Sequence, residues 1–294
     1  MPKKIAICVG QNRYAPWSGV SPLNGCVNDA LLIGEMLRMA GFDHIRQVHD
    51  HAATQVGILG RLEDAIASLG AGDHLVFWNS SHGYQVRDRD GDELEDHRDE
   101  AICSYDTDPR APLTDDKFAR VLAHAHPGAH VFFASDSCHS GTLTRTGVSA
   151  DARRPRLWLP PDDIRFRSGE PMIDLSTYVG GLRPPVPTPP PARLFGLFGR
   201  PPEAIDHVLL TGCRADQVSW DAMLGGRFHG AMTYHFAIAV LRAWKEGQAI
   251  TYREAHRQAC GGVTRAGFDQ SPQLEGGAEL IDLPVFGFVP GGSS

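Results

Sequence analysis

The chain contains an apolar run that leads directly into a polar, reactive segment: HVFFASDSCHSG, residues 130–141. Val and Phe dominate the run, which has the length and character of a strand buried on both faces. A second run of this kind, HLVFW at residues 74–78, leads into NSSHG at residues 79–83. Strands of this type are typical of parallel sheets, in which ligands bind beyond the carboxyl ends of the strands. The two stretches therefore predict a fold and also the edge of the sheet that holds a site.

Strand and helix patterns alternate along the rest of the chain. Three further apolar runs, at residues 4–9, 44–48 and 207–210, are expected as strands. Four helices are expected: one capped by Asn28 or Asp29 and ending at Gly41, one beginning at Thr54 with Val56, Leu59, Leu62 and Ile66 inward, one beginning at Thr114 or Asp115, and one over residues 231–244. Such alternation implies right-handed crossovers between parallel strands. The predicted fold class is α/β, a mostly parallel central sheet flanked by helices on both faces.

The composition describes a globular chain of 294 residues, 42% hydrophobic and 21% charged, with a formal net charge of −7. This length and apolar content suffice for one large core. The negative balance argues against nucleic acid as the main partner, because phosphate backbones need a basic surface. No apolar run approaches a membrane span, and the run after Lys4 is too short for a signal peptide. We therefore expect neither a nucleic-acid nor a membrane partner.

The six cysteines are scattered and form no CxxC pair. In a chain of this length that pattern is typical of a reducing compartment and not of a disulfide framework, so a cytoplasmic location is expected. Four of them are interpreted as buried structural residues: Cys8, Cys103, Cys213 and Cys260. Zinc is a competing interpretation for a chain rich in Cys and His, although the short CxxC spacing that is typical of zinc sites does not occur.

Two segments interrupt the alternation of strands and helices. Residues 87–100 carry eight carboxylates in fourteen positions, which predicts a solvated hairpin or loop. Residues 148–202 include PPVPTPPP at positions 184–191 and many arginines. Proline at this density removes backbone donors and blocks both helix and sheet. We expect this second segment to be a long exposed excursion between two core strands.

Cys138 and His82 each follow one of the two apolar runs, so a parallel sheet would bring them to the same edge. A cysteine thiolate attacks a carbonyl carbon, and an imidazolium protonates the leaving amine. Gly83 and Gly141 have no β-carbon, so backbone N–H groups near each reactive residue can approach a developing oxyanion closely. This arrangement predicts acyl transfer.

Several sequence blocks resemble those of the metacaspases and their bacterial relatives, the orthocaspases, among the caspase-like cysteine peptidases. The blocks occur in the same order as in that family. The blocks are NGCVNDA at 24–30, SHG at 81–83, LTDD at 113–116, DSCHSG at 136–141, TGCRADQ at 211–217 and QSPQ at 270–273. The resemblance covers nearly the whole chain. It implies the caspase-hemoglobinase fold, with residues 1–294 as a single peptidase domain and residues 148–202 as a Pro- and Arg-rich insertion within it. It also implies a monomer.

The resemblance implies a cysteine endopeptidase that works through a thioester acyl-enzyme. Cys138 would be the nucleophile and His82 the acid and base, with the backbone N–H groups of Gly83 and Cys138 as oxyanion donors. The substrates implied are proteins or peptides, which would be cut after Arg or Lys, since the metacaspases cleave at these residues.

The resemblance also implies an acidic pocket for that basic residue. Asp29 and Asp136, aided by Ser80 and Cys26, would line it. Two carboxylates accept a guanidinium fork through charge-assisted hydrogen bonds. Without the resemblance, Asp29 would be interpreted as a helix cap and Asp136 as a hydrogen-bond acceptor at a strand end.

A calcium site is a further implication, with ligands at Asp99, Asp115 and Asp116 and at the seventh position after the nucleophile. Arg145 stands at that seventh position, and a cation there weakens a site that needs six to eight oxygen ligands and neutralised charge. We therefore expect no cofactor to be required, and any calcium to bind at the three carboxylates.

Self-processing within residues 148–202 is a hypothesis, because this segment follows the nucleophile and contains arginines. Arg154, Arg183 and Arg200 precede proline, which resists acylation of the bond. The candidates that remain are Arg153, Arg156, Arg165, Arg167 and Arg193. Two alternatives stay open: a catalytically silent caspase-like module that docks partners, and a zinc hydrolase.

Overall fold

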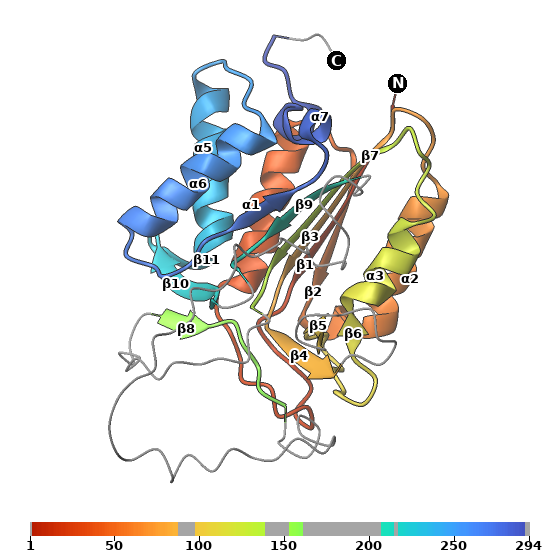
Figure 1. Ribbon diagram of the computed structural model, residues 1–294, viewed down its shortest axis with the longest axis vertical. Coiled ribbons are helices and arrows are strands. Elements are labelled where there is room, and N and C mark those ends of the chain that lie inside the picture. The colour runs from red at the N-terminus through yellow and green to blue at the C-terminus, as the bar shows by residue number, and fades with distance from the viewer. Residues whose placement is uncertain (1, 88–97, 139–152, 161–206, 215–216, 292–294) are drawn as a thin grey trace, which may run out of the picture.

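A six-stranded sheet forms the centre of the protein, as a computed structural model that describes residues 2–87, 98–138, 153–160, 207–214 and 217–291 shows (Figure 1). Its strand order is β12-β9-β7-β3-β1-β2. The strands are β1 (Lys4–Gly10), β2 (His44–His49), β3 (His74–Ser80), β7 (His130–Asp136), β9 (Val208–Thr211) and β12 (Gln273–Glu275). β12 runs antiparallel to β9, and the other neighbouring pairs are parallel. The five predicted strands and the α/β fold class are confirmed.

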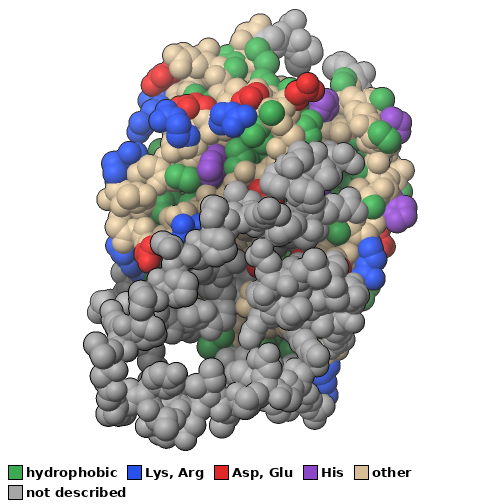
Figure 2. Space-filling view, in the orientation of Figure 1, with side chains coloured by type: hydrophobic (Ala, Val, Ile, Leu, Met, Phe, Trp, Pro, Cys, Tyr) green, Lys and Arg blue, Asp and Glu red, His purple; other side chains and the backbone are tan. Residues whose placement is uncertain are grey.

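Helices cover both faces of this sheet (Figure 1). One face carries α1 (Cys26–Met39), α5 (Ala231–Lys245) and α6 (Tyr252–Arg265), and the other carries α2 (Gln55–Ala67) and α3 (Asp115–Leu122). The short helices are α7 (Ala278–Ile281), η1 (Asp50–Ala52) and η4 (Val285–Gly287). On the face seen in Figure 2, Lys and Arg side chains are interspersed with Asp and Glu side chains where the surface is described.

Alternation along the central strands fills two separate cores. Phe77 and Phe133 stack with their ring centroids 4.7 Å apart on the side of α2 and α3. Their neighbours Trp78 and Phe132 point to the opposite face, where both rings lie against Phe236 of α5. Burying a large apolar side chain stabilises the fold by roughly 1.5–3 kcal/mol. Apolar side chains on both faces therefore hold the central strands, and with them the ends of β3 and β7, in fixed positions.

Two small antiparallel sheets lie beyond the carboxyl ends of the central strands (Figure 1). The first consists of β4 (Gly83–Arg87), β5 (Arg98–Ile102) and β6 (Leu113–Thr114). The second has the order β11-β10-β8, with β8 (Arg153–Pro155), β10 (Trp220–Leu224) and β11 (Arg227–Gly230). Gly225 and Gly226 join β10 to β11 with φ of 57° and 86°, which a two-residue hairpin turn with positive φ requires.

The start of α1 differs from the prediction. The helix begins at Cys26 with Gly25 as its N-cap, so neither Asn28 nor Asp29 caps it. The reason is that the side chain of Asn12, in the loop after β1, accepts from the backbone nitrogen of Cys26 at 2.9 Å. Asp29 is thereby left inside the first turn, where its carboxylate is available for other contacts.

The predicted start of α2 is confirmed, because Thr54 is its N-cap and accepts from the backbone nitrogen of Gly57 at 3.1 Å. The inward orientation predicted for Val56 is wrong, since 80% of this residue is exposed. Ile58 takes the inward position of that turn instead.

Parts of two predicted segments lie outside the described residues. Of residues 148–202, the structure describes residues 153–160, and the remainder of the expected excursion is outside the description. Residues 88–97 are outside it as well, but their flanks β4 and β5 pair antiparallel, as the ends of a hairpin do. The six cysteines all lie in the described ranges, and none of them forms a disulfide. Within the described ranges, no helix has the length and apolar character needed to cross a membrane.

Candidate functional site

His82 and Cys138 lie at one edge of the central sheet. β3 and β7 pair in parallel with Ser80 opposite Asp136, and His82 and Cys138 each follow two residues later. Both are buried. The parallel register therefore places an imidazole and a thiol beyond the same pair of strand ends.

His82 is held by contacts to the loop after β1. Its backbone nitrogen donates to the Tyr14 hydroxyl at 2.9 Å, and its Nε2 lies 2.9 Å from the carbonyl oxygen of Ser21. Burial lowers the pKa of His82 to about 4, although the carbonyl of Ser21 opposes the shift; the charge of Arg156 also lowers this pKa. The imidazole is therefore neutral at pH 7 and able to accept a proton.

The Cys138 thiol shares an acceptor with a second thiol. Cys138 Sγ donates to the carbonyl oxygen of Gln217 at 3.0 Å, and Cys213 Sγ donates to the same oxygen at 3.3 Å. The contact with Cys138, together with burial, raises the pKa of Cys213 well above its ordinary value. Cys213 is buried, as interpreted from the sequence, but it lies beside Cys138 and not in a remote part of the core.

Two backbone N–H groups converge on one carbonyl oxygen at this edge. The nitrogen of Gly83 donates to the carbonyl oxygen of Arg156 at 2.9 Å, and the nitrogen of Cys138 donates to the same oxygen at 3.3 Å. On the far side of this peptide bond, the nitrogen of Trp158 donates to the carbonyl oxygen of Gly83 at 2.9 Å. The peptide bond between Arg156 and Leu157 is thus fixed beside both groups that the sequence predicts as oxyanion donors.

The side chain of Arg156 is enclosed by three carboxylates. Nη2 lies 2.7 Å from Asp29 Oδ2 and 3.2 Å from Asp221 Oδ1, and Nη1 lies 3.4 Å from Asp136 Oδ2. All four side chains have no exposed surface. A buried ion costs several kcal/mol of desolvation unless it is paired and hydrogen-bonded, and here the pairing is extensive.

Protonation in this pocket follows from burial and the excess of acid. Burial would lower the pKa of Arg156, but Cys26 and the three carboxylates raise it well above its ordinary value. Burial raises the pKa of Asp136 and of Asp221, while Arg156 opposes both shifts. The pocket accordingly favours a permanently charged guanidinium.

Each carboxylate is oriented by backbone and side-chain donors. The largest set of donors belongs to Asp29: Ser80 Oγ at 2.6 Å, His229 Nδ1 at 2.9 Å and Gly230 N at 3.0 Å. Asp136 accepts from the backbone nitrogen and hydroxyl of Thr233, and Asp221 accepts from the backbone nitrogen of Asn24. Each carboxylate is therefore held by donors other than the guanidinium as well.

Gly230 leaves the space that the guanidinium fills. A β-carbon at this position would clash with Asp136 Oδ2 and would lie 2.5 Å from Arg156 Nη1 and 2.8 Å from Cζ, closer than side-chain atoms pack. A larger residue here would therefore displace the Asp136 carboxylate, the guanidinium or both.

The structure brings together all four residues predicted for an acidic pocket: Asp29, Asp136, Ser80 and Cys26 lie around Arg156. Asp221 and His229 were not identified from the sequence as residues of this pocket. A signal was present, because the Gly225–Gly226 pair predicts a hairpin turn. That hairpin pairs Asp221 with Gly230 across the two strands, beside the pocket.

The three carboxylates predicted for calcium lie in one region. Asp99 is on β5, and Asp115 and Asp116 form the first turn of α3, which follows the β6 strand that pairs with β5. Asp99 and Asp115 are buried. In the described part of the chain, no group of three or more His, Cys, Asp or Glu side chains is arranged to hold a metal ion. The calcium site stays a prediction.

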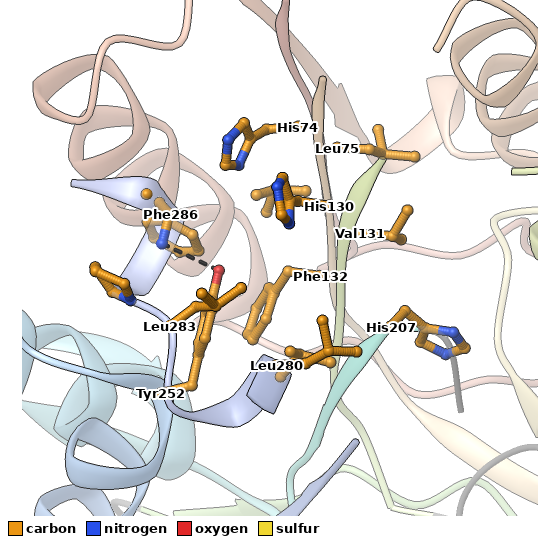
Figure 3. Close-up of a pocket in the computed structure, with 14 residues that line it drawn as sticks. His74, Leu75, His130, Val131, Phe132, His207, Tyr252, Leu280, Leu283 and Phe286 are labelled. Atoms are coloured by element: carbon orange, nitrogen blue, oxygen red, sulfur yellow. Dashed lines mark hydrogen bonds between the residues drawn. The ribbon is translucent and has the colours of Figure 1, made fainter. Parts of the chain in front are cut away.

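A second cavity lies at the opposite end of the parallel strands (Figure 3). His74 and His130, at the starts of β3 and β7, line it together with Tyr252 and Phe286. Burial and then the neighbouring His130 lower the pKa of His74 to about 4. The lining contains neither cysteine nor carboxylate, and the length of the strands separates it from Cys138.

Comparisons with known proteins agree with this architecture. The model of the family described as "Caspase domain" matches residues 3–278. Metacaspase-1 of Meyerozyma guilliermondii is 26% identical over 254 residues, which cover 80% of this chain and 61% of that protein. Metacaspase-1 of Cryptococcus neoformans var. neoformans serotype D is 28% identical over 295 residues, which cover 92% and 62%. The chain thus spans about three fifths of the length of these curated relatives.

A solved structure matches over the full length of the fold. The crystal structure of protein GSU0716 from Geobacter sulfurreducens has a TM-score of 0.66 to this chain at 25% sequence identity. The match covers 98% of this chain and 100% of that one.

Proposed function

Because the chain belongs to the caspase domain family, we propose that it is a cysteine endopeptidase that cleaves proteins or peptides after Arg or Lys. One observation carries the proposal. The carbonyl oxygen of Arg156 accepts from the nitrogens of Gly83 and Cys138, while its guanidinium pairs with buried carboxylates. A substrate presents the same two groups, a scissile carbonyl and a basic side chain. We propose that the domain acts as a monomer, with residues 148–202 as an insertion within it.

The chemistry of the proposal begins at the Cys138 thiol. In the resting arrangement the thiol donates to the Gln217 carbonyl, and this bond breaks before reaction. His82 then takes the thiol proton, and sulfur attacks the carbonyl carbon of the basic residue. The carbonyl oxygen becomes an oxyanion, which the N–H groups of Gly83 and Cys138 stabilise.

Collapse of this tetrahedral intermediate breaks the carbon–nitrogen bond and leaves a thioester on Cys138. The proton held by His82 passes to the leaving group, so the first product leaves as a neutral amine. Water then attacks the thioester carbon as His82 takes one of its protons, and the thiol is regenerated as the acid product leaves. Atoms and charges balance without a metal or an oxidant.

Preference for a basic residue follows from the charges in the pocket. A neutral or acidic side chain would leave Asp29, Asp136 and Asp221 buried without a cation. Removing one partner of a buried ion pair costs roughly 3–5 kcal/mol. Arg suits three carboxylates better than Lys, because its planar fork presents several donors in fixed directions.

Self-processing after Arg156 follows from the same geometry. Among the arginines considered from the sequence, Arg156 lies with its carbonyl at the two N–H groups, whereas Arg153 lies upstream in β8. Arg165, Arg167 and Arg193 are outside the described residues. While Arg156 fills the pocket, no other basic residue can enter, so cleavage of the Arg156–Leu157 bond precedes cleavage of other substrates.

A second candidate function is a catalytically silent caspase-like module. The occupied pocket and the bond between the Cys138 thiol and Gln217 favour it, since both describe a closed site. Fluorogenic peptides that end in Arg, Lys or Asp before a reporter amine separate the two. The peptidase predicts hydrolysis in the order Arg, Lys and then Asp, with all activity lost in Cys138→Ala and His82→Ala. Equal, slow hydrolysis that Cys138→Ala does not change would support the silent module.

A further inference from the structure

The residues before Arg156 lie along β10 as an added strand. β8 pairs antiparallel with β10, with Arg154 opposite Asp221 and Arg153 opposite Ala222. The ladder continues to the pocket, where the nitrogen of Arg156 donates to the carbonyl oxygen of Ser219 at 2.9 Å. Addition of an extended peptide to a sheet edge supplies main-chain affinity and places alternate side chains in separate surroundings.

Arg153, three residues before Arg156, has a binding surface of its own. Its guanidinium lies over the ring of Phe268, 4.4 Å from the centroid. Nη1 donates to the carbonyl oxygen of Gly267 at 3.0 Å, and Nη2 donates to that of Ala266 at 3.2 Å. Stacking on an aromatic face combined with two forked hydrogen bonds is a combination that a guanidinium provides and an apolar side chain does not.

The end of α6 builds this surface. Gly267 has φ of 74°, and its nitrogen donates to the carbonyl of Thr264 at 3.0 Å. The nitrogen of Phe268 donates to the carbonyl of Val263 at 3.2 Å, and the two side chains pack in one cluster. These bonds form a Schellman motif, which fixes the ring of Phe268. The negative end of the helix dipole lies at the same place and attracts a cation.

The neighbouring Arg154 has no comparable surroundings among the described residues. Its Nη1 donates to the carbonyl oxygen of Pro22 at 3.2 Å in an exposed position. One exposed hydrogen bond discriminates weakly between side chains. Selectivity upstream of the cleaved bond is therefore concentrated at the position of Arg153.

We infer that Phe268 and the carbonyl oxygens of Ala266 and Gly267 form a subsite for a basic side chain, preferably Arg, three residues before the residue whose bond is cleaved. The inference rests on the proposed function, because it takes Arg156 as the residue at the cleaved bond. The substrate class is then a peptide that carries two basic residues in the pattern Arg-x-x-Arg. The first side chain binds at the carbonyl oxygens and the ring of Phe268, and the second binds in the pocket of buried carboxylates.

The test uses the full chain after incubation that permits self-processing. Peptides of sequence X-Arg-Pro-Arg with a fluorogenic amine are compared, where X is Arg, Met or Glu. Met matches the length of Arg without charge or donors. The structure predicts that kcat/KM is about tenfold higher for X = Arg than for X = Met, and lowest for X = Glu. The Phe268→Leu variant reduces the ratio of Arg to Met toward one.

A matched control is Phe288→Leu, which removes a ring that lies against Trp244, away from β8, with centroids 4.4 Å apart. This variant keeps the ratio of the wild-type chain. Hydrolysis of the Arg and Met peptides within twofold of each other overturns the subsite while leaving the proposed peptidase intact. Absence of any hydrolysis that depends on Cys138 overturns the proposed function, and the subsite fails with it.

Discussion

The guanidinium of Arg156 donates to Asp29 over 2.7 Å, and neither side chain has any exposed surface. The two residues are 127 positions apart in the chain, so the contact joins α1 to the segment that follows Cys138. It links the stability of the uncut protein to the pocket that would recognise substrates. Loss of this cation therefore has consequences for folding as well as for activity.

The Arg156→Ala variant should be less stable than the wild-type chain by about 3–5 kcal/mol at pH 7, because it leaves three buried carboxylates without a cation. Urea unfolding of chains that also carry Cys138→Ala, so that no cleavage interferes, measures the difference. Arg154→Ala is the matched control, since Arg154 is exposed and its side chain donates a hydrogen bond to the carbonyl oxygen of Pro22 alone among the described residues. Equal loss of stability in both variants would contradict the account.

The stability deficit of the Arg156→Ala variant should depend on pH. Burial raises the pKa of Asp136 and Asp221 above the ordinary value of 3.8, and removal of Arg156 takes away the charge that opposes this. A carboxyl with a raised pKa in the folded state stabilises the fold below its ordinary pKa, and that contribution is lost as the pH rises through the raised value. The deficit of Arg156→Ala against wild type should thus grow as the pH rises above about 4. A deficit that shrinks as the pH rises would contradict the idea that Arg156 neutralises a group of buried carboxylates.

Self-cleavage should persist to mildly acidic pH. His82 must be neutral to take the thiol proton, and burial lowers its pKa to about 4. The rate should fall only as the pH drops through that value, and not through the usual histidine range near 6.5. Quenched time courses between pH 3.5 and 8, resolved by mass spectrometry, give the profile. An acid limb centred near 6.5 would show that His82 is solvated in the reacting state.

The Gly230→Ala variant should lose at least about tenfold in kcat/KM for Arg peptides, since the added methyl group clashes with the Asp136 carboxylate and with the place of the guanidinium. Gly60→Ala is the control: a β-carbon there meets no atom within 4 Å. If both variants retain wild-type kcat/KM, the basic residue binds elsewhere.

Calcium should have little effect on the rate. The position seven residues after Cys138 is Arg145, which lies outside the described residues; the resemblance to the metacaspases implies a calcium ligand at this sequence position, and a cation there weakens such a site. Rates in millimolar calcium and in chelator should agree within twofold, whereas Arg145→Asp should gain activation by calcium. Strong activation of the wild-type chain would show that Asp99, Asp115 and Asp116 suffice.

The strands and the edge of the sheet were predictable because they depend on local pattern. Runs such as residues 74–78 and 130–134 are apolar on both faces, and parallel pairing then places the residues after them together. α6 was not predicted, because two glycines and several charged residues interrupt its apolar periodicity. Signals for its ends were present, since Thr251 accepts from the backbone nitrogen of Glu254 at the start and Gly267 follows the end.

Local pattern identified neither the third carboxylate nor the occupant of the pocket, although the Gly225–Gly226 pair indicates the hairpin that carries Asp221. β8 reads Arg-Arg-Pro, which has no strand character, and it becomes a strand through pairing with β10, some 65 residues later. Asp221 acquires its role through the same pairing. Contacts between residues this far apart in the sequence depend on tertiary packing, and the hydrophobic periodicity of a segment does not reveal them.

We propose that Arg156 is held as an internal substrate. Intact-mass analysis compares freshly purified and incubated wild-type protein with Cys138→Ala. We expect a pair of fragments that separate between Arg156 and Leu157 in the wild-type chain, with Cys138→Ala remaining whole. A wild-type chain that stays intact at this bond, or fragments that form equally in Cys138→Ala, would contradict it.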